Sequence, residues 1–140
     1  MAAPVKALFD LNVLLDVLQK REPFYADSAR ALACAETGRV QGFVAPHSLT
    51  TLFYLVAKDQ SPAGARVTLT SLLQFLSVAP VDGTTVEQAL NLPYRDFEDA
   101  VQMMAAVQCK ADYLVTRNSR DFQPALLPVI QPAELAALVS

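Results

Sequence analysis

The sequence is poor in the residues on which several kinds of active site depend. Its 140 residues include 4 glycines, 2 cysteines, 1 histidine and no tryptophan. The glycines are scattered, which excludes a P-loop and a GxGxxG turn, and cysteine and histidine have no zinc-ligand spacing. His47 stands beside Ser48 where a helix is expected to begin, so a capping role is favoured over a Ser-His-Asp triad. Cys34 and Cys109 lie in separate apolar stretches and predict free, buried thiols of a cytoplasmic protein.

Long apolar runs are also missing. The longest unbroken one covers residues 52–57, far short of the ~20 residues that a membrane span requires. The first residues place a single lysine before a short apolar segment that ends in Asp10, which is not the pattern of a signal peptide. We therefore expect a cytoplasmic protein without membrane association.

Charged residues make up only 18% of the chain, whereas apolar residues make up 53%. This balance excludes intrinsic disorder, and the length predicts a single domain over residues 1–140. The net charge of −3 is opposite to that of proteins that bind nucleic acid through bulk charge. Any contact with phosphates must then come from a local patch or from a metal ion.

Short apolar segments alternate with segments of helical periodicity. We expect strands at 5–9, 42–45, 78–81, 112–116 and 129–130, and helices at 12–19, 25–37, 48–58, 62–77, 82–90, 96–110 and from 132 onward. Short, continuously apolar strands between helices indicate a parallel sheet buried on both faces. The expected fold is a three-layer α/β/α sandwich with a short, mostly parallel sheet, in which ligands bind at the carboxyl ends of the strands.

Acidic residues stand at two of the positions where such a ligand would bind. Asp10 ends the first strand, where its carboxylate can bind a hard cation or can simply cap the following helix. Asp96 and Asp99 are three residues apart and share one face of a helix. The alternative is that Asp96 and Asp99 only cap and stabilise the start of this helix, because acids are favoured at the amino end of a helix.

A third polar group, residues 116–122, follows a strand directly. Asn118 and Asp121 can complete a metal site, and Arg117 and Arg120 can contact phosphates; the alternative is a polar turn with solvated charges. Taken together, three sets of oxygen ligands at strand ends fit a Mg²⁺ or Mn²⁺ site.

Two segments resemble the PIN domain family. Residues 9–24, FDLNVLLDVLQKREPF, resemble its opening, and residues 96–122, DFEDAVQMMAAVQCKADYLVTRNSRDF, resemble its carboxyl-terminal half. The resemblance spans about residues 5–122. It implies a fold similar to that of the 5′-nucleases and cleavage of RNA with Mg²⁺ or Mn²⁺. Many such domains are the toxin of a VapBC toxin–antitoxin pair.

The resemblance also implies roles for individual residues. Asp10 and Asp99 become the acidic metal ligands, Asn118 occupies the family's fourth position, Asp121 is a nearby acid, and Asn12 orients Asp10.

At the helix position where the family carries a glutamate, this chain has Thr51. The cation is then held mainly by Asp10 and Asp99, with Asp96 or Asp121 in support. Asp16 and Asp96 are expected to hold waters or to orient the ligands. The predicted function is that of a metal-dependent endoribonuclease whose partners are RNA, a cognate antitoxin and a second copy of the chain. The alternative is a degenerate PIN domain that binds RNA or protein.

Overall fold

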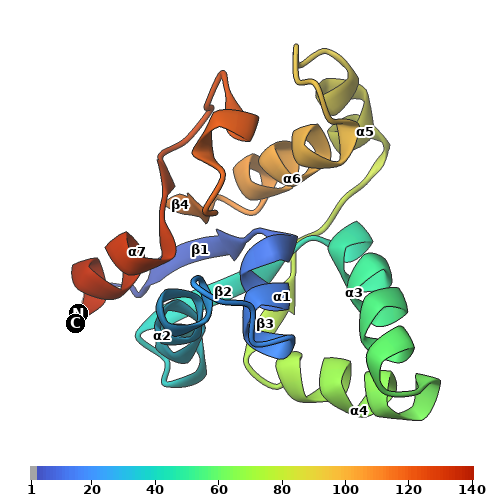
Figure 1. Cartoon of the computed structure of the whole chain (residues 1–140). Coiled ribbons are helices and arrows are strands. Elements are labelled where there is room, and N and C mark those ends of the chain that lie inside the picture. Colours follow the sequence, from blue (N-terminus) through green and yellow to red (C-terminus); the bar gives the residue numbers. More distant parts are fainter. Residues whose placement is uncertain (1–2) are drawn as a thin grey trace.

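The computed structural model describes residues 3–140, and five short strands of this part form one sheet (Figure 1). The strands are β1 (Val5–Phe9), β2 (Val40–Val44), β3 (Leu76–Val78), β4 (Tyr113–Val115) and β5 (Val129–Ile130). Their spatial order is β3-β2-β1-β4-β5, and every pair is parallel. This arrangement confirms the predicted parallel sheet and puts β1 at its centre.

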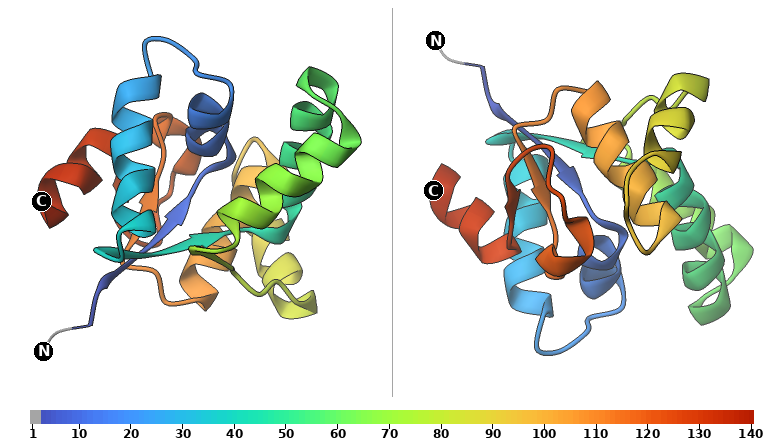
Figure 2. Two further views of the ribbon diagram at one scale, coloured as in Figure 1. Left: turned by 90° about the horizontal axis from the view of Figure 1, so that it is seen from below. Right: turned by 90° about the horizontal axis from the view of Figure 1, so that it is seen from above.

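Helices cover both faces of the sheet, as the two views of Figure 2 show. One side carries α1 (Leu11–Leu18), α2 (Tyr25–Glu36) and α7 (Pro132–Val139), with α3 (Pro46–Asp59) and α4 (Pro62–Leu72) beside them; the other carries α5 (Gly83–Leu90) and α6 (Phe97–Gln108). The side chains of β1 alternate between the layers: Phe9 packs in the core on the α1 and α2 side, and Leu8 packs against Met103 of α6. The three-layer sandwich is thereby confirmed.

The largest departure from the sequence prediction lies between α4 and β3. The helix expected to reach residue 77 ends at Leu72, and the strand expected at 78–81 begins at Leu76. Leu76 pairs with Gly42 of β2, and Ala79 donates its backbone N–H to the carbonyl of Val44 at 2.9 Å. The ladder stops there because its partner strand β2 ends at Val44 and α3 begins at Pro46. The sequence did not reveal this boundary, because the helical spacing of apolar residues in α4 continues into β3.

Other differences are smaller. The predicted polar loop at 117–121 contains a short 3₁₀ helix, η1 (Ser119–Phe122), and β2 begins two residues earlier than expected. Cys34 and Cys109 are free thiols, as predicted, although Cys109 is only partly buried. Among the helices of residues 3–140, none combines the length and the apolar character that a membrane crossing needs.

Candidate functional site

The candidate site lies at the carboxyl ends of β1 and β4, which are neighbours in the sheet. Asp10 follows β1 and Thr116 follows β4, and the backbone N–H of Asp10 donates to the carbonyl of Val115 at 2.9 Å. The Asp10 carboxylate accepts hydrogen bonds from Thr116 Oγ1 at 2.9 Å and from Gln102 Nε2 at 3.0 Å. With 3% of its surface exposed, Asp10 is held in one orientation by two uncharged donors.

The geometry of Asp10 argues against a role as a simple helix cap. Its side chain makes no capping hydrogen bond to the backbone of α1, although the N–H groups of Leu11 and Asn12 lie close to it. Burial raises the pKa of Asp10, and the bonds from Gln102 and Thr116 offset part of that rise. A buried acid whose side chain does not cap the start of α1 is therefore available for chemistry.

Asp96 and Asp99 approach the same place from the start of α6. Asp96 is the cap of this helix, because its Oδ1 accepts from the backbone N–H of Glu98 at 2.8 Å and of Asp99 at 3.3 Å. Asp99 lies in the first turn and is half-buried. Burial, followed by repulsion from Asp96, Asp10, Asp121 and Glu98, raises the pKa of Asp99 to about 7. The negative charges of four neighbouring acidic residues thus disfavour the ionised form of Asp99.

These side chains line one pocket of about 180 Å³. Its lining is Asp10, Leu11, Asn12, His47, Ser48, Asp96, Glu98, Asp99, Gln102, Asn118, Asp121 and Phe122. Six of the ten residues predicted for the site are among them, namely Asp10, Asn12, Asp96, Asp99, Asn118 and Asp121. We call this space the acidic pocket.

The sequence prediction missed four polar residues that line the acidic pocket: His47, Ser48, Gln102 and the acid Glu98. Gln102 follows Asp99 by three residues, so helical spacing alone places both on one face of α6. His47 and Ser48 follow β2, another strand that ends at this edge. The signal was present in their positions, but an amide, an imidazole and a hydroxyl do not stand out in a search for acids.

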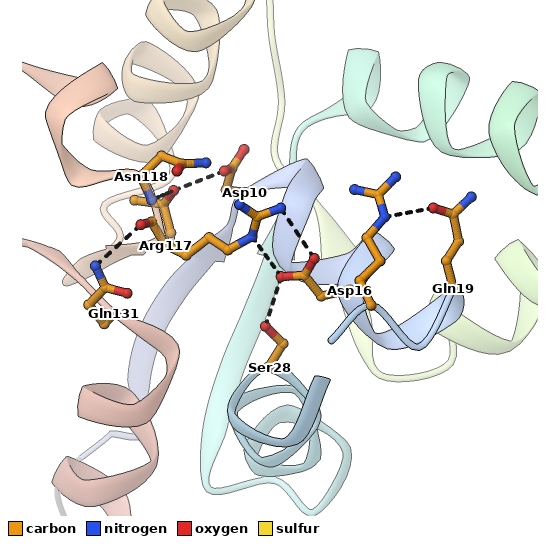
Figure 3. A network of polar contacts seen from close by, with 9 residues as sticks. Asp10, Asp16, Gln19, Ser28, Arg117, Asn118 and Gln131 are labelled. Atoms are coloured by element: carbon orange, nitrogen blue, oxygen red, sulfur yellow. Dashed lines mark hydrogen bonds and ion pairs between the residues drawn. The ribbon is translucent and has the colours of Figure 1, made fainter. Parts of the chain in front are cut away.

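Thr51 and Asp16 lie outside the lining of the acidic pocket. Thr51 is on α3, and its Oγ1 donates to the backbone carbonyl of His47 at 3.4 Å. Asp16 is fully buried on α1, where its carboxylate accepts from Ser28 Oγ at 3.3 Å and from Arg117 (Figure 3). Asp16 therefore supports the site through Arg117, which belongs to the loop that follows β4.

The two arginines expected to contact phosphates differ in their surroundings. Arg117 Nε lies 2.9 Å from Asp16 Oδ2, and the guanidinium carbon lies 4.0 Å from the ring centre of Phe24. This side chain anchors its loop, as Figure 3 shows. Arg120 is exposed and shares a second, adjoining pocket with Arg117, Asn118 and Asp121. Arg120 is the more available of the two for a phosphate.

The donor chemistry of the acidic pocket fits a hard divalent cation. Carboxylate and amide oxygens are the ligands that Mg²⁺ and Mn²⁺ prefer, and Mg²⁺ commonly binds through one or two carboxylates while it keeps several waters. Within residues 3–140, no three His, Cys, Asp or Glu side chains gather closely enough to hold a metal among themselves. A cation in this pocket would therefore need other ligands as well, such as water.

The fold and the pocket together define a class: a small α/β domain with an acidic, cation-compatible pocket at the carboxyl ends of its central parallel strands. A model of the PIN domain matches residues 6–120, and the chain belongs to the PIN domain family. This membership confirms the resemblance seen in the sequence. No curated protein matches the chain.

Solved structures share the fold over nearly the whole chain. A toxin–antitoxin complex from Klebsiella pneumoniae contains a chain with 23% identity and a TM-score of 0.70, covering 90% of this chain and 97% of the other. The structure of VapBC2 from Rickettsia felis, bound to a promoter DNA fragment, has a chain with 16% identity and a TM-score of 0.69. The match covers 91% of this chain and 98% of the other. The structure of DNA-bound VapBC from Salmonella typhimurium has a chain with 16% identity and a TM-score of 0.67, and the match covers 91% of this chain and 98% of the other.

Proposed function

We propose that this protein is a VapC-like toxin, a metal-dependent endoribonuclease that hydrolyses RNA phosphodiester bonds. The observation that carries the proposal is the acidic pocket, where Asp10 and Asp99 come close enough for the charge of one to raise the pKa of the other. Crowding carboxylates in a partly buried pocket disfavours their charged forms, and a bound cation would stabilise those charged forms. Membership of the PIN domain family and the fold shared with toxin–antitoxin complexes agree with this proposal.

The polar residues in and beside the acidic pocket have distinct parts in the proposed reaction. Asp10 and Asp99 would hold Mg²⁺ or Mn²⁺, with Asp96, Asp121 and Asn118 around them. When bound, the cation would supply a water of lowered pKa and positive charge for the phosphate oxygens. Thr116 and Gln102 fix the orientation of the Asp10 carboxylate.

Other residues position the substrate and the loop that carries Asn118. Arg120, exposed beside the acidic pocket, would contact a neighbouring phosphate of single-stranded RNA. The ion pair between Arg117 and Asp16 holds that loop against α1. Asn12 lines the acidic pocket next to Asp10, where its amide can help to orient that carboxylate.

The experiment is Mn²⁺- and Mg²⁺-dependent cleavage of single-stranded RNA by the wild type, Asp10→Asn and Asp99→Asn. Asp59→Asn is the matched control, because Asp59 is an exposed acid at the end of α3 and does not line the acidic pocket. We expect cleavage by the wild type and Asp59→Asn, and its loss in both pocket variants and in EDTA. Equal cleavage by all four proteins would identify a contaminating nuclease and overturn the proposal.

A second candidate function is a binding module without catalysis. The observation that favours it is Thr51, whose hydroxyl bonds to the backbone of its own helix and does not line the acidic pocket. A cation that binds only the folded state raises the melting temperature with its concentration. A rise with millimolar Mn²⁺ favours the nuclease, whereas an unchanged melting temperature favours the binding module.

The proposed partners follow from the same comparisons. The Rickettsia felis and Klebsiella pneumoniae structures are toxin–antitoxin complexes, which supports an antitoxin as partner of this chain. A short open reading frame directly upstream of the gene, whose product co-purifies with the chain, would test it. Homodimerisation stays a prediction, which light scattering of the purified chain would test.

A further inference from the structure

Two buried side-chain atoms without a hydrogen-bond partner lie on the same pocket. Among the buried side-chain nitrogen and oxygen atoms of residues 3–140, Gln102 Oε1 and His47 Nδ1 are the two that have none. Both residues line the acidic pocket. A buried polar atom left unpaired is destabilising, so native proteins contain few of them. Their coincidence at one place points to a ligand that satisfies both.

The orientation of the Gln102 amide is fixed by its neighbour. Its Nε2 donates to Oδ1 of Asp10 at 3.0 Å, and a carboxylate oxygen can only accept. The amide carbonyl must therefore point away from Asp10. Because only 3% of Gln102 is exposed, Oε1 is a buried acceptor that needs a donor from within the pocket.

The same reasoning applies to His47. Its Nε2 lies 3.1 Å from the backbone carbonyl of Glu98, which can only accept, so this nitrogen carries a hydrogen. In the neutral ring, Nδ1 is then an acceptor as well. The described lining of the acidic pocket contains no lysine or arginine to act as donor. The pocket thus combines two unpaired acceptors with several carboxylates.

We propose that Gln102 and His47 hold the cation of this pocket through its waters, with Gln102 acting also as the positioning residue of Asp10. The inference rests on the proposed function, since it takes the cation as given. A hydrated cation presents positively polarised O–H donors, which is what two neutral acceptors beside carboxylates require. Mg²⁺ gives up its waters reluctantly, and no three acidic side chains here gather closely enough to replace them.

The test uses cobalt(III) hexammine, whose six ammine ligands donate hydrogen bonds and do not exchange for carboxylates. Binding to the full chain is measured by calorimetry and by amide chemical-shift changes, beside Mn²⁺ and Mg²⁺, without any assay of cleavage. The variants are Gln102→Met and His47→Phe, which remove the acceptors at similar volume. Gln74→Met is the control, because Gln74 is exposed beyond the end of α4 and does not line the pocket.

We expect hexammine to bind the wild type in competition with Mg²⁺, and each pocket variant to weaken its binding about tenfold, as loss of an outer-shell partner commonly does. Gln74→Met should bind like the wild type. Melting curves identify a variant that does not fold, and the other variant then decides the result. Mn²⁺ binding without hexammine binding, or hexammine binding that both folded variants leave unchanged, would overturn this inference alone. Failure of both cations to bind would overturn the proposed function together with it.

Discussion

The guanidinium of Arg117 and the carboxylate of Asp16 form an ion pair across 101 residues of sequence, with Nε 2.9 Å from Oδ2. The Asp16 side chain is fully buried, and 20% of that of Arg117 is exposed. The pair joins α1, which follows the strand that ends at Asp10, to the loop that carries Asn118. Its integrity should therefore affect both the stability of the fold and the shape of the acidic pocket.

Replacing Arg117 by methionine should destabilise the fold more than its partial exposure suggests. The change leaves Asp16 buried without a compensating charge, a loss typically worth about 3 kcal/mol or more. Urea unfolding monitored by circular dichroism measures the free energy of unfolding.

Two further variants test the cause of that loss. Arg120→Met removes an exposed arginine from the same loop and should change the free energy of unfolding by less than about 0.5 kcal/mol. Adding Asp16→Asn to Arg117→Met should recover part of the lost stability, because no unpaired charge then stays buried. Equal losses for Arg117→Met and Arg120→Met would contradict the structural role of the pair.

In the absence of divalent cations, stability should fall as the pH rises from about 4 to 7. An unfolded aspartate loses its proton near pH 4, whereas Asp99 in the folded chain has a pKa of about 7. Between these values the folded state holds a proton that the unfolded state has released, so raising the pH favours unfolding. The pKa of Asp10 is also raised, which adds an effect in the same direction.

Asp99→Asn removes the titrating group and isolates its part of this effect. In EDTA, the variant should melt at a higher temperature than the wild type at pH 8 and at a similar temperature at pH 4. Thermal unfolding at both pH values measures the difference, with Asp59→Asn as the control for replacing an exposed acid. A difference between wild type and Asp99→Asn that is the same at both pH values would rule out a raised pKa at Asp99.

Gly42→Ala should destabilise the core on the α2 side of the sheet. A Cβ atom at Gly42 would lie 2.6 Å from Cδ2 of Leu76 and 3.0 Å from Cβ of Ala35. Overpacking of this kind costs about 1–3 kcal/mol, measured as a shift in the urea midpoint. Gly83→Ala is the matched control: nothing lies within 4 Å of its added methyl, and it begins α5, so its effect should be neutral or slightly stabilising.

Local sequence patterns correctly predicted those strands and helix caps that depend on neighbouring residues alone. The strand at Val5–Phe9 and the helix cap at Asp96 follow from an apolar run and a capping acid, and the structure contains both. Parallel order then brings Asp10 and Thr116 together, because the ends of neighbouring parallel strands meet at one edge. The positions of Asp10, Asp96, Asp99 and Asp121 were accessible by this reasoning, whereas Glu98 was not assigned to the pocket.

Interactions between distant residues were beyond the reach of the sequence. The start of β3 depends on the pairing of Leu76 with Gly42, which a continuing helical period concealed. Arg117 was expected at a phosphate, and only the fold reveals that Asp16 lies within reach of it. The unpaired acceptor of Gln102 likewise depends on how its amide meets Asp10, which spacing along a helix does not encode.

Arg120→Gln should weaken the binding of single-stranded RNA and make it less sensitive to salt. Each phosphate contact made by an arginine releases condensed counterions, so its loss should reduce the slope of log Kd against log salt by about 0.7. The measurement is fluorescence anisotropy with a labelled oligonucleotide between low and moderate salt, in an Asp99→Asn background that prevents cleavage. Arg39→Gln is the control, because Arg39 is exposed just before β2, at the opposite edge of the sheet. A salt slope that Arg120→Gln leaves at the Arg39→Gln value would remove Arg120 from the RNA path.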